Sequence, residues 1–125
     1  MSEIRATTIS DAAGTGPITL TKQSAAKAYA KYNTITSTTL TNSFNVSSLT
    51  DHGTGDTSTV FTSAMTSRDY IVVAGADDSS WGTVVTLDYS SGNTSSTSRN
   101  RTASNFSPAN CDCEDNYITI HGDLA

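Results

Sequence analysis

Serine and threonine occupy 41 of the 125 positions, 19 and 22 respectively, and this hydroxyl content constrains the fold more than any other feature of the chain. Hydrophobic residues make up only 35% of the sequence, so a chain of this length has little apolar material for a core. Disordered acidic chains are usually rich in Glu, Lys and Pro, whereas this one has two Pro. Because threonine favours pleated strands, the composition predicts one mainly β domain with exposed, hydroxyl-covered strand faces.

The charge balance excludes two classes of partner. Lys and Arg number 7 against 12 Asp and Glu, which gives a net charge of −5. Proteins that track nucleic-acid phosphates or bind anionic membranes need clustered positive charge.

No apolar run approaches the roughly 20 residues that span a bilayer, and the N-terminus lacks the basic and apolar regions of a secretory signal. We therefore expect no nucleic-acid partner, no membrane insertion and no secretory leader.

The N-terminal third differs in pattern from the remainder. Glycines and a proline break residues 4–20, which predicts an extended arm. Residues 22–28 are rich in Ala and predict a short helix, with a strand beginning near Tyr29. The apolar stripe is too thin to anchor a helix alone, which predicts an interface with other copies of the chain. Its residues are Ala25, Ala28, Tyr29 and Tyr32. We accordingly assign 1–33 to an arm and helix for docking or oligomerisation, and 34–125 to a β domain.

A hairpin is predicted between residues 43 and 65. Segment 43–49 alternates, with Phe44 and Val46 expected on one face, and 57–65 forms the second strand. The turn between them combines two glycines suited to positive φ with acidic side chains that bond backbone amides. The turn residues are Asp51, His52, Gly53, Gly55 and Asp56.

Segments 70–76 and 81–89 are the most apolar in the chain, so we predict them as the central strands. Their expected core residues are Ile71, Val73, Val84 and Leu87. Residues 117–121 read as a last strand, with His121 facing away from Ile118 and Ile120. Short strands at this spacing predict an antiparallel β-sandwich or a jelly-roll-like pair of sheets.

Few residues offer chemistry. His52 between Asp51 and Asp56 resembles an acid/base cluster, but turn roles explain all three and no placed nucleophile or pocket accompanies them. The aromatic residues Trp81, Tyr70, Tyr89 and Tyr117 suit either a core or a sugar-binding face. An acidic turn at Asp77 and Asp78 lacks the spacing of a calcium loop. No catalytic sequence motif occurs, so we expect no enzyme activity, no catalytic residue, no cofactor and no metal.

Cys111 and Cys113 lie one residue apart. A direct bridge at this spacing is strained, which favours two free thiols. A disulfide and a metal site remain as alternatives, since Asp112, Glu114 and Asp115 lie in the same segment. A zinc set would need a second pair of Cys or His ligands, which the sequence does not offer.

Residues 42–65, NSFNVSSLTDHGTGDTSTVFTSAM, carry a resemblance. They are similar to a segment of tail-fibre and other virion appendage proteins of tailed phages, especially marine ones, typically R-x-S-F-N-V-S-S-I-T-D-N-G-T-G-D-Y-x-V-x-F-x-x-A-M. The start, TISDAAGTGPITLTKQSAAKA, and the end, IHGDLA, also look like such proteins. Departures are Tyr29, where the family has Trp, His52 in place of Asn, and Thr57 in place of Tyr. Residues 71–116 do not align with the family.

The resemblance implies a non-enzymatic structural protein located in the virion. It suggests a small homotrimeric fibre or tail-tip component that contacts other phage structural proteins and attaches to a host surface glycan or receptor. A capsid decoration protein that stabilises the head is the alternative. A glycan depolymerase is the least favoured, and its candidate acids would be Asp77, Asp78, Asp112 and Glu114.

Overall fold

The protein is mainly β. The computed structural model describes residues 25–77, 83–87, 93–104 and 109–124, with the backbone alone for 83–87. These residues form eight strands in two four-stranded antiparallel sheets. The strands are β1 (Ala28–Asn33), β2 (Thr39–Phe44), β3 (Val46–Gly53), β4 (Asp56–Phe61), β5 (Ile71–Asp77), β6 (Thr83–Leu87), β7 (Thr97–Ser104) and β8 (Asp115–His121). Within the described ranges, no helix has the length and hydropathy needed to cross a membrane.

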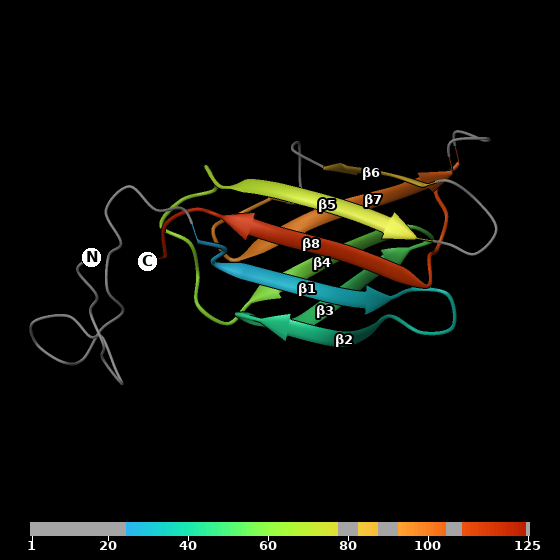
Figure 1. Ribbon diagram of the computed structural model, residues 1–125, viewed down its shortest axis with the longest axis horizontal. Helices are drawn as coiled ribbons and strands as arrows, with labels where there is room; N and C mark the ends of the chain where they lie inside the picture. The colour runs from blue at the N-terminus through green and yellow to red at the C-terminus, as the bar shows by residue number, and fades with distance from the viewer. Residues whose placement is uncertain (1–24, 78–82, 88–92, 105–108, 125) are drawn as a thin grey trace, which may run out of the picture.

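The two sheets form two layers (Figure 1). The front sheet has the strand order β2-β1-β8-β5, and the back sheet has the order β3-β4-β7-β6. Consecutive strands pair as hairpins in β1–β2, β3–β4 and β6–β7, whereas β8 pairs with β1 on one side and β5 on the other. The first and last strands, β1 and β8, are therefore neighbours in the front sheet.

The interior lies between the sheets and closes within a single chain. Alternate residues of β1 and β8 point into it, and Phe61 packs edge-on against Tyr70 with ring centroids 5.7 Å apart. The apolar cluster consists of Ala28, Ala30, Tyr32, Val46, Phe61, Met65, Tyr70, Ile118 and Ile120. Hydroxyl and amide side chains continue it: Asn116 accepts from the Thr102 hydroxyl at 3.1 Å and donates to the Tyr32 carbonyl at 3.3 Å. Threonine and asparagine therefore substitute for part of the missing apolar core.

Asn45 directs the chain from the front sheet to the back sheet. It has φ of 54°, in the left-handed region that Asn tolerates better than most residues. Its side-chain carbonyl accepts from the Ser63 amide at 2.7 Å, and its amide group donates to the Lys27 carbonyl at 3.0 Å. The prediction that Phe44 and Val46 share a face is wrong, because this corner leaves Phe44 exposed on β2 and turns Val46 inward on β3.

The predicted helix over 22–28 is wrong for 25–28: residues 25–27 are not helical and β1 begins at Ala28. The remainder of that segment and the predicted arm lie outside the described residues. Local propensity favours a helix there, but β1 pairs with β2 on one side and β8 on the other. In this extended conformation every second side chain, Ala28, Ala30 and Tyr32, is buried in the interior. β1 is an inner strand of the front sheet, so residues 28–33 pair with β2 and β8.

The predicted central strands are edge strands. β5 and β6 lie at the ends of their sheets. Ile71 and Val73 are 66% and 58% exposed, while Val72 and Ala74 pack against the interior. The prediction of Ile71 and Val73 as core residues is therefore wrong, since an apolar run does not reveal which of its two faces is covered. The side chains of Val84 and Leu87 lie outside the described residues.

Candidate interaction surface on the front sheet

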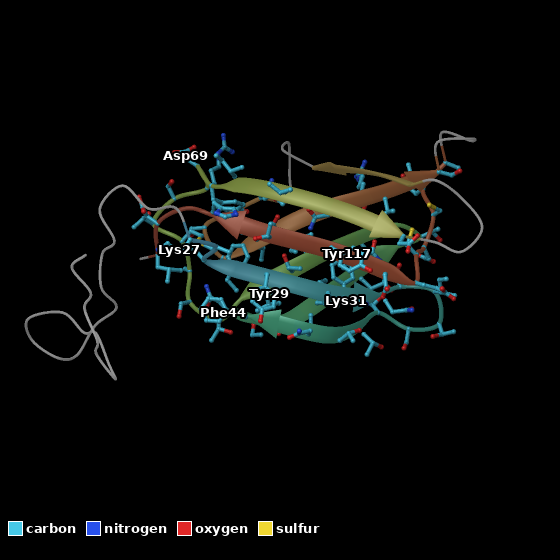
Figure 2. All side chains as sticks on the ribbon, in the orientation of Figure 1. Lys27, Tyr29, Lys31, Phe44, Asp69 and Tyr117 are labelled. Atoms are coloured by element: carbon cyan, nitrogen blue, oxygen red, sulfur yellow. The ribbon has the colours of Figure 1, made fainter. Side chains whose placement is uncertain are left out.

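One side of the front sheet faces away from the interior, and we call it the front face. The register aligns its residues in rows: Tyr29 lies opposite Phe44 and Thr119, and Thr119 lies opposite Val73. A second row contains Asn42, Lys31, Tyr117 and Gly75. Figure 2 shows Tyr29, Phe44, Lys31 and Tyr117 over β1, β2 and β8 on the side towards the viewer.

Large apolar side chains gather on the front face. The described part of the chain leaves six exposed, and five of them lie here; the sixth, Ile35, lies in the loop after β1. The five are Tyr29 (41% exposed), Phe44 (52%), Ile71 (66%), Val73 (58%) and Tyr117 (41%). Contiguous apolar patches on soluble proteins usually mark interaction sites. The front face is therefore the candidate site of this molecule.

The front face carries an aromatic pair on β1 and β2 and an ion pair between β1 and β8. The rings of Tyr29 and Phe44 lie 26° from parallel with centroids 6.0 Å apart. Lys31 Nζ lies 2.9 Å from Asp115 Oδ2 and 5.3 Å from the centroid of the Tyr117 ring, whose hydroxyl donates to the same carboxylate at 2.9 Å. The bond from Lys31 lowers the pKa of Asp115, and bonding to Asp115 raises the pKa values of Lys31 and Tyr117. Asp115 and Lys31 are therefore both charged at neutral pH.

The outer side of the back sheet, which we call the back face, is polar where its side chains are described. Arg99 donates from Nε to Asp56 Oδ1 and from Nη2 to Oδ2, both at 2.7 Å, and Arg101 Nε lies 3.3 Å from Oδ2. The paired Arg99 guanidinium holds the pKa of Asp56 below its ordinary value. His52 Nε2 lies 2.9 Å from Ser58 Oγ. Ionic and hydroxyl groups on this face thus bind one another.

The suspected acid/base cluster has structural roles. Asp51 accepts from the Gly53 amide at 2.8 Å and from the Thr38 hydroxyl at 2.7 Å, and these bonds lower its pKa. Asp56 binds two arginines, as described above. The two carboxylates bind these partners, and His52 lies against Ser58, so the structure does not bring the three residue types into a relay from Asp through His to Ser.

The hairpin turn is held by the loop before β8. Gly53 and Gly55 have φ of 120° and 63°. The Gly55 amide donates to Asp112 Oδ1 at 2.8 Å, and its carbonyl accepts from the Thr102 amide at 2.8 Å. A Cβ on Gly55 would meet the Thr102 carbonyl oxygen at 2.5 Å. Asp112, a candidate acid in the sequence, therefore fastens the turn.

The cysteines are free thiols with their sulfur atoms 3.9 Å apart. Cys113 is fully buried, and its backbone carbonyl accepts from the Thr34 amide at 3.0 Å. In the described ranges there is no group of three or more Cys, His, Asp or Glu side chains that could hold a metal ion.

The predicted interface residues divide between the two sides of β1. Ala28 and Tyr32 are buried in the chain's own interior, whereas Tyr29 lies on the front face and Ala25 is exposed before the strand. His121 faces away from Ile118 and Ile120, as predicted.

The other sequence candidates are scattered. Of the possible sugar-binding aromatics, Tyr70 is buried and donates to the Thr97 carbonyl at 2.6 Å, and Tyr117 lies on the front face. Trp81 and Tyr89 lie outside the described residues. Among the candidate acids, Asp77 ends β5, Glu114 is exposed, and Asp78 is outside the description.

Sequence reasoning missed Phe44, Ile71 and Val73 as surface residues. The sequence did indicate an exposed apolar face on this strand: residues 71–74 are apolar at both odd and even positions, which gives the strand two apolar faces. Comparison with family models, with curated proteins and with solved structures finds no match to this chain.

Proposed function

We propose that the chain is a non-enzymatic structural protein of a tailed-phage virion, a small homotrimeric fibre or tail-tip component. The β region would form an antiparallel sandwich directed outward. Residues before β1 would be the arm that docks on other virion proteins. Contact with a host surface glycan or receptor would be a further role of the outward domain.

The resemblance in residues 42–65 supports this proposal, because the residues that carry it stabilise the β3–β4 hairpin. Asp51 caps the turn, Gly55 packs against the strand and loop beside it, and Asp56 binds Arg99. A segment whose distinctive residues build a hairpin is typical of a scaffold. No reaction is needed to explain any of them.

The observation that carries the proposal is the gathering of exposed apolar side chains on the front face. A protein that acts alone in solution gains nothing from exposing five such residues together, and it risks aggregation. In a component that is packed against neighbouring proteins in a particle, those neighbours cover such residues.

Immunogold electron microscopy of the purified particles, with antibodies against this chain, tests the location. Label at the tail supports a fibre or tip role, and label over the head supports the capsid decoration alternative. Absence of the chain from particles, checked by mass spectrometry of their proteins, contradicts the proposal. Light scattering tests the homotrimer, which requires three times the 13.1 kDa chain mass.

A further inference from the structure

Among the described residues, none covers the front face, and the chemistry of this face limits what can bind there. Its two most exposed apolar side chains, Ile71 and Val73, are aliphatic. They offer no ring to stack on and no hydrogen bond, so a glycan laid over them would leave its hydroxyl groups without partners. A protein surface with its own apolar side chains suits them better.

The charges of the front face nearly balance. Lys27 and Lys31 contribute two positive charges, and Asp77, Asp115 and the exposed Asp69 before β5 contribute three negative charges, whereas the chain as a whole carries −5. Two copies therefore repel each other through most of their surface and much less through this face. A second copy of the same chain is electrostatically acceptable here.

The charges are also distributed unequally along the strands. His121 lies opposite Ile71 at one end of the sheet, where Lys27 precedes β1, while Asp77 lies opposite Asp115 at the other end. Figure 2 shows Lys27 at the end where β1 begins. One end of the front face carries Lys27 and His121 with Asp69 nearby, and the other carries Asp77 beside the Lys31–Asp115 pair, so the second end is the more acidic.

We propose that a second copy of this chain binds to the front face across a two-fold axis, with the strands of the two copies antiparallel. The end with Asp77 and Asp115 then covers the partner's end with Lys27 and His121, whereas a parallel arrangement would set the aspartates against each other. The same rotation places the row that contains Val73 over the partner's row that contains Gly75. Gly75 has no atom within 4 Å of a potential Cβ, so the partner's valine has room.

The size of the face sets the expected affinity. Four strands spaced about 4.8 Å apart and about seven residues of 3.4 Å each give roughly 450 Å² for each copy, or roughly 900 Å² for the pair. Specific interfaces usually bury about 1,200 Å² or more in total. We therefore expect a dissociation constant in the micromolar range, with the two-fold contact reinforced where many copies are held together.

Sedimentation of the full chain between about 1 and 500 µM tests the pairing. We expect a reversible doubling of the number of copies, from one to two or from three to six. Val73→Glu should weaken it at least tenfold, and so should Ile71→Glu, because each places a carboxylate in the apolar contact. Thr50→Glu adds the same charge to an exposed position on β3 of the back face and is the matched control. Circular dichroism checks that each variant is folded.

A charge exchange tests the antiparallel arrangement. His121→Asp and Asp77→Lys should each weaken association, because each gives both ends of the face the same sign. The double variant should restore it. Recovery can arise only between copies, because Ile71 and the other residues of β5 separate the two positions within one chain.

The pairing and the proposed function fail separately. Three copies whose association is unaffected by Val73→Glu would support a homotrimer and overturn the two-fold contact. A single copy at every concentration overturns both the pairing and the homotrimer. Equal weakening by Val73→Glu and Thr50→Glu overturns the assignment to the front face.

Discussion

The front and back faces are built from the same kind of antiparallel strand, yet they have opposite surface chemistry. The front face exposes Tyr29, Phe44 and Val73 to solvent. On the back face, by contrast, Asp56 and Arg99 form a bidentate ion pair. Both sheets share one interior, so neither outer face is needed to build the apolar core.

The difference indicates that the two faces have separate tasks. Polar groups of the back face bind one another and the hairpin turn, so they contribute to the stability of the fold. Apolar groups of the front face are exposed, and we propose that they contribute to association. Substitutions matched between the two sheets should therefore separate loss of stability from loss of association.

The largest difference should come from two glycines. Gly55→Ala on the back-sheet hairpin should lower the free energy of unfolding by roughly 3–5 kcal/mol, because the new methyl group meets two backbone carbonyls and φ is positive. Gly75→Ala on the front face meets no atom within 4 Å and should change it by no more than about 0.5 kcal/mol. Urea denaturation measures both. Similar losses would show that the back sheet is not the more constrained of the two.

The next test contrasts the two sides of one strand. Ile120→Ala removes a fully buried side chain from the interior side of β8 and should cost roughly 2–5 kcal/mol of unfolding free energy. Thr119→Ala, on the front face of the same strand, should cost less than about 1 kcal/mol. Thermal unfolding followed by circular dichroism compares them. A large loss at Thr119 would mean that the front face already supports the fold.

A smaller effect should come from the ion pairs. Asp56→Asn breaks the bidentate bond with Arg99 at a nearly buried carboxylate and should cost roughly 1–3 kcal/mol at neutral pH. Asp115→Asn breaks an exposed pair on the front face and should cause no measurable change.

The pH dependence sharpens this comparison. Because the pKa of Asp56 is lowered in the folded chain, its stabilising contribution is present above the ordinary aspartate pKa of about 4. The contribution is lost as the pH falls through the lowered value. Asp56→Asn should therefore unfold with a shallower acid dependence below about pH 4 than the wild type does. An unchanged acid limb would show that the back-face pair is not a source of stability.

The sequence was sufficient to predict a mainly β chain and the turn of the β3–β4 hairpin. Threonine content and the spacing of Gly53 and Gly55 are local signals, and the structure follows them. The helix predicted up to Ala28 failed where pairing with both β2 and β8 overrides the propensity of alanine. Local preference decides an element only where distant strands do not compete for it.

The candidate site was harder to predict. Tyr29 was expected at an interface because it lies on the apolar stripe of a predicted helix. It lies instead on the front face of a strand. Ile71 and Val73 were expected in the core, because a continuous apolar run is typical of a central strand that is covered on both faces. The position of β5 at the edge of the sheet depends on its long-range pairing with β8, which no local pattern records.

The smallest expected effect tests whether the aromatic residues of the front face help the fold at all. Tyr29 and Phe44 lie opposite each other on β1 and β2 with their rings 6.0 Å apart. A double-mutant cycle with Tyr29→Ala and Phe44→Ala should give a coupling of roughly 0.5–1 kcal/mol, as for other exposed cross-strand aromatic pairs. The cycle is measured at about 1 µM protein, so that association through the front face does not add to the unfolding free energy. A coupling above about 2 kcal/mol would make the pair part of the folding core and remove the distinction between the two faces.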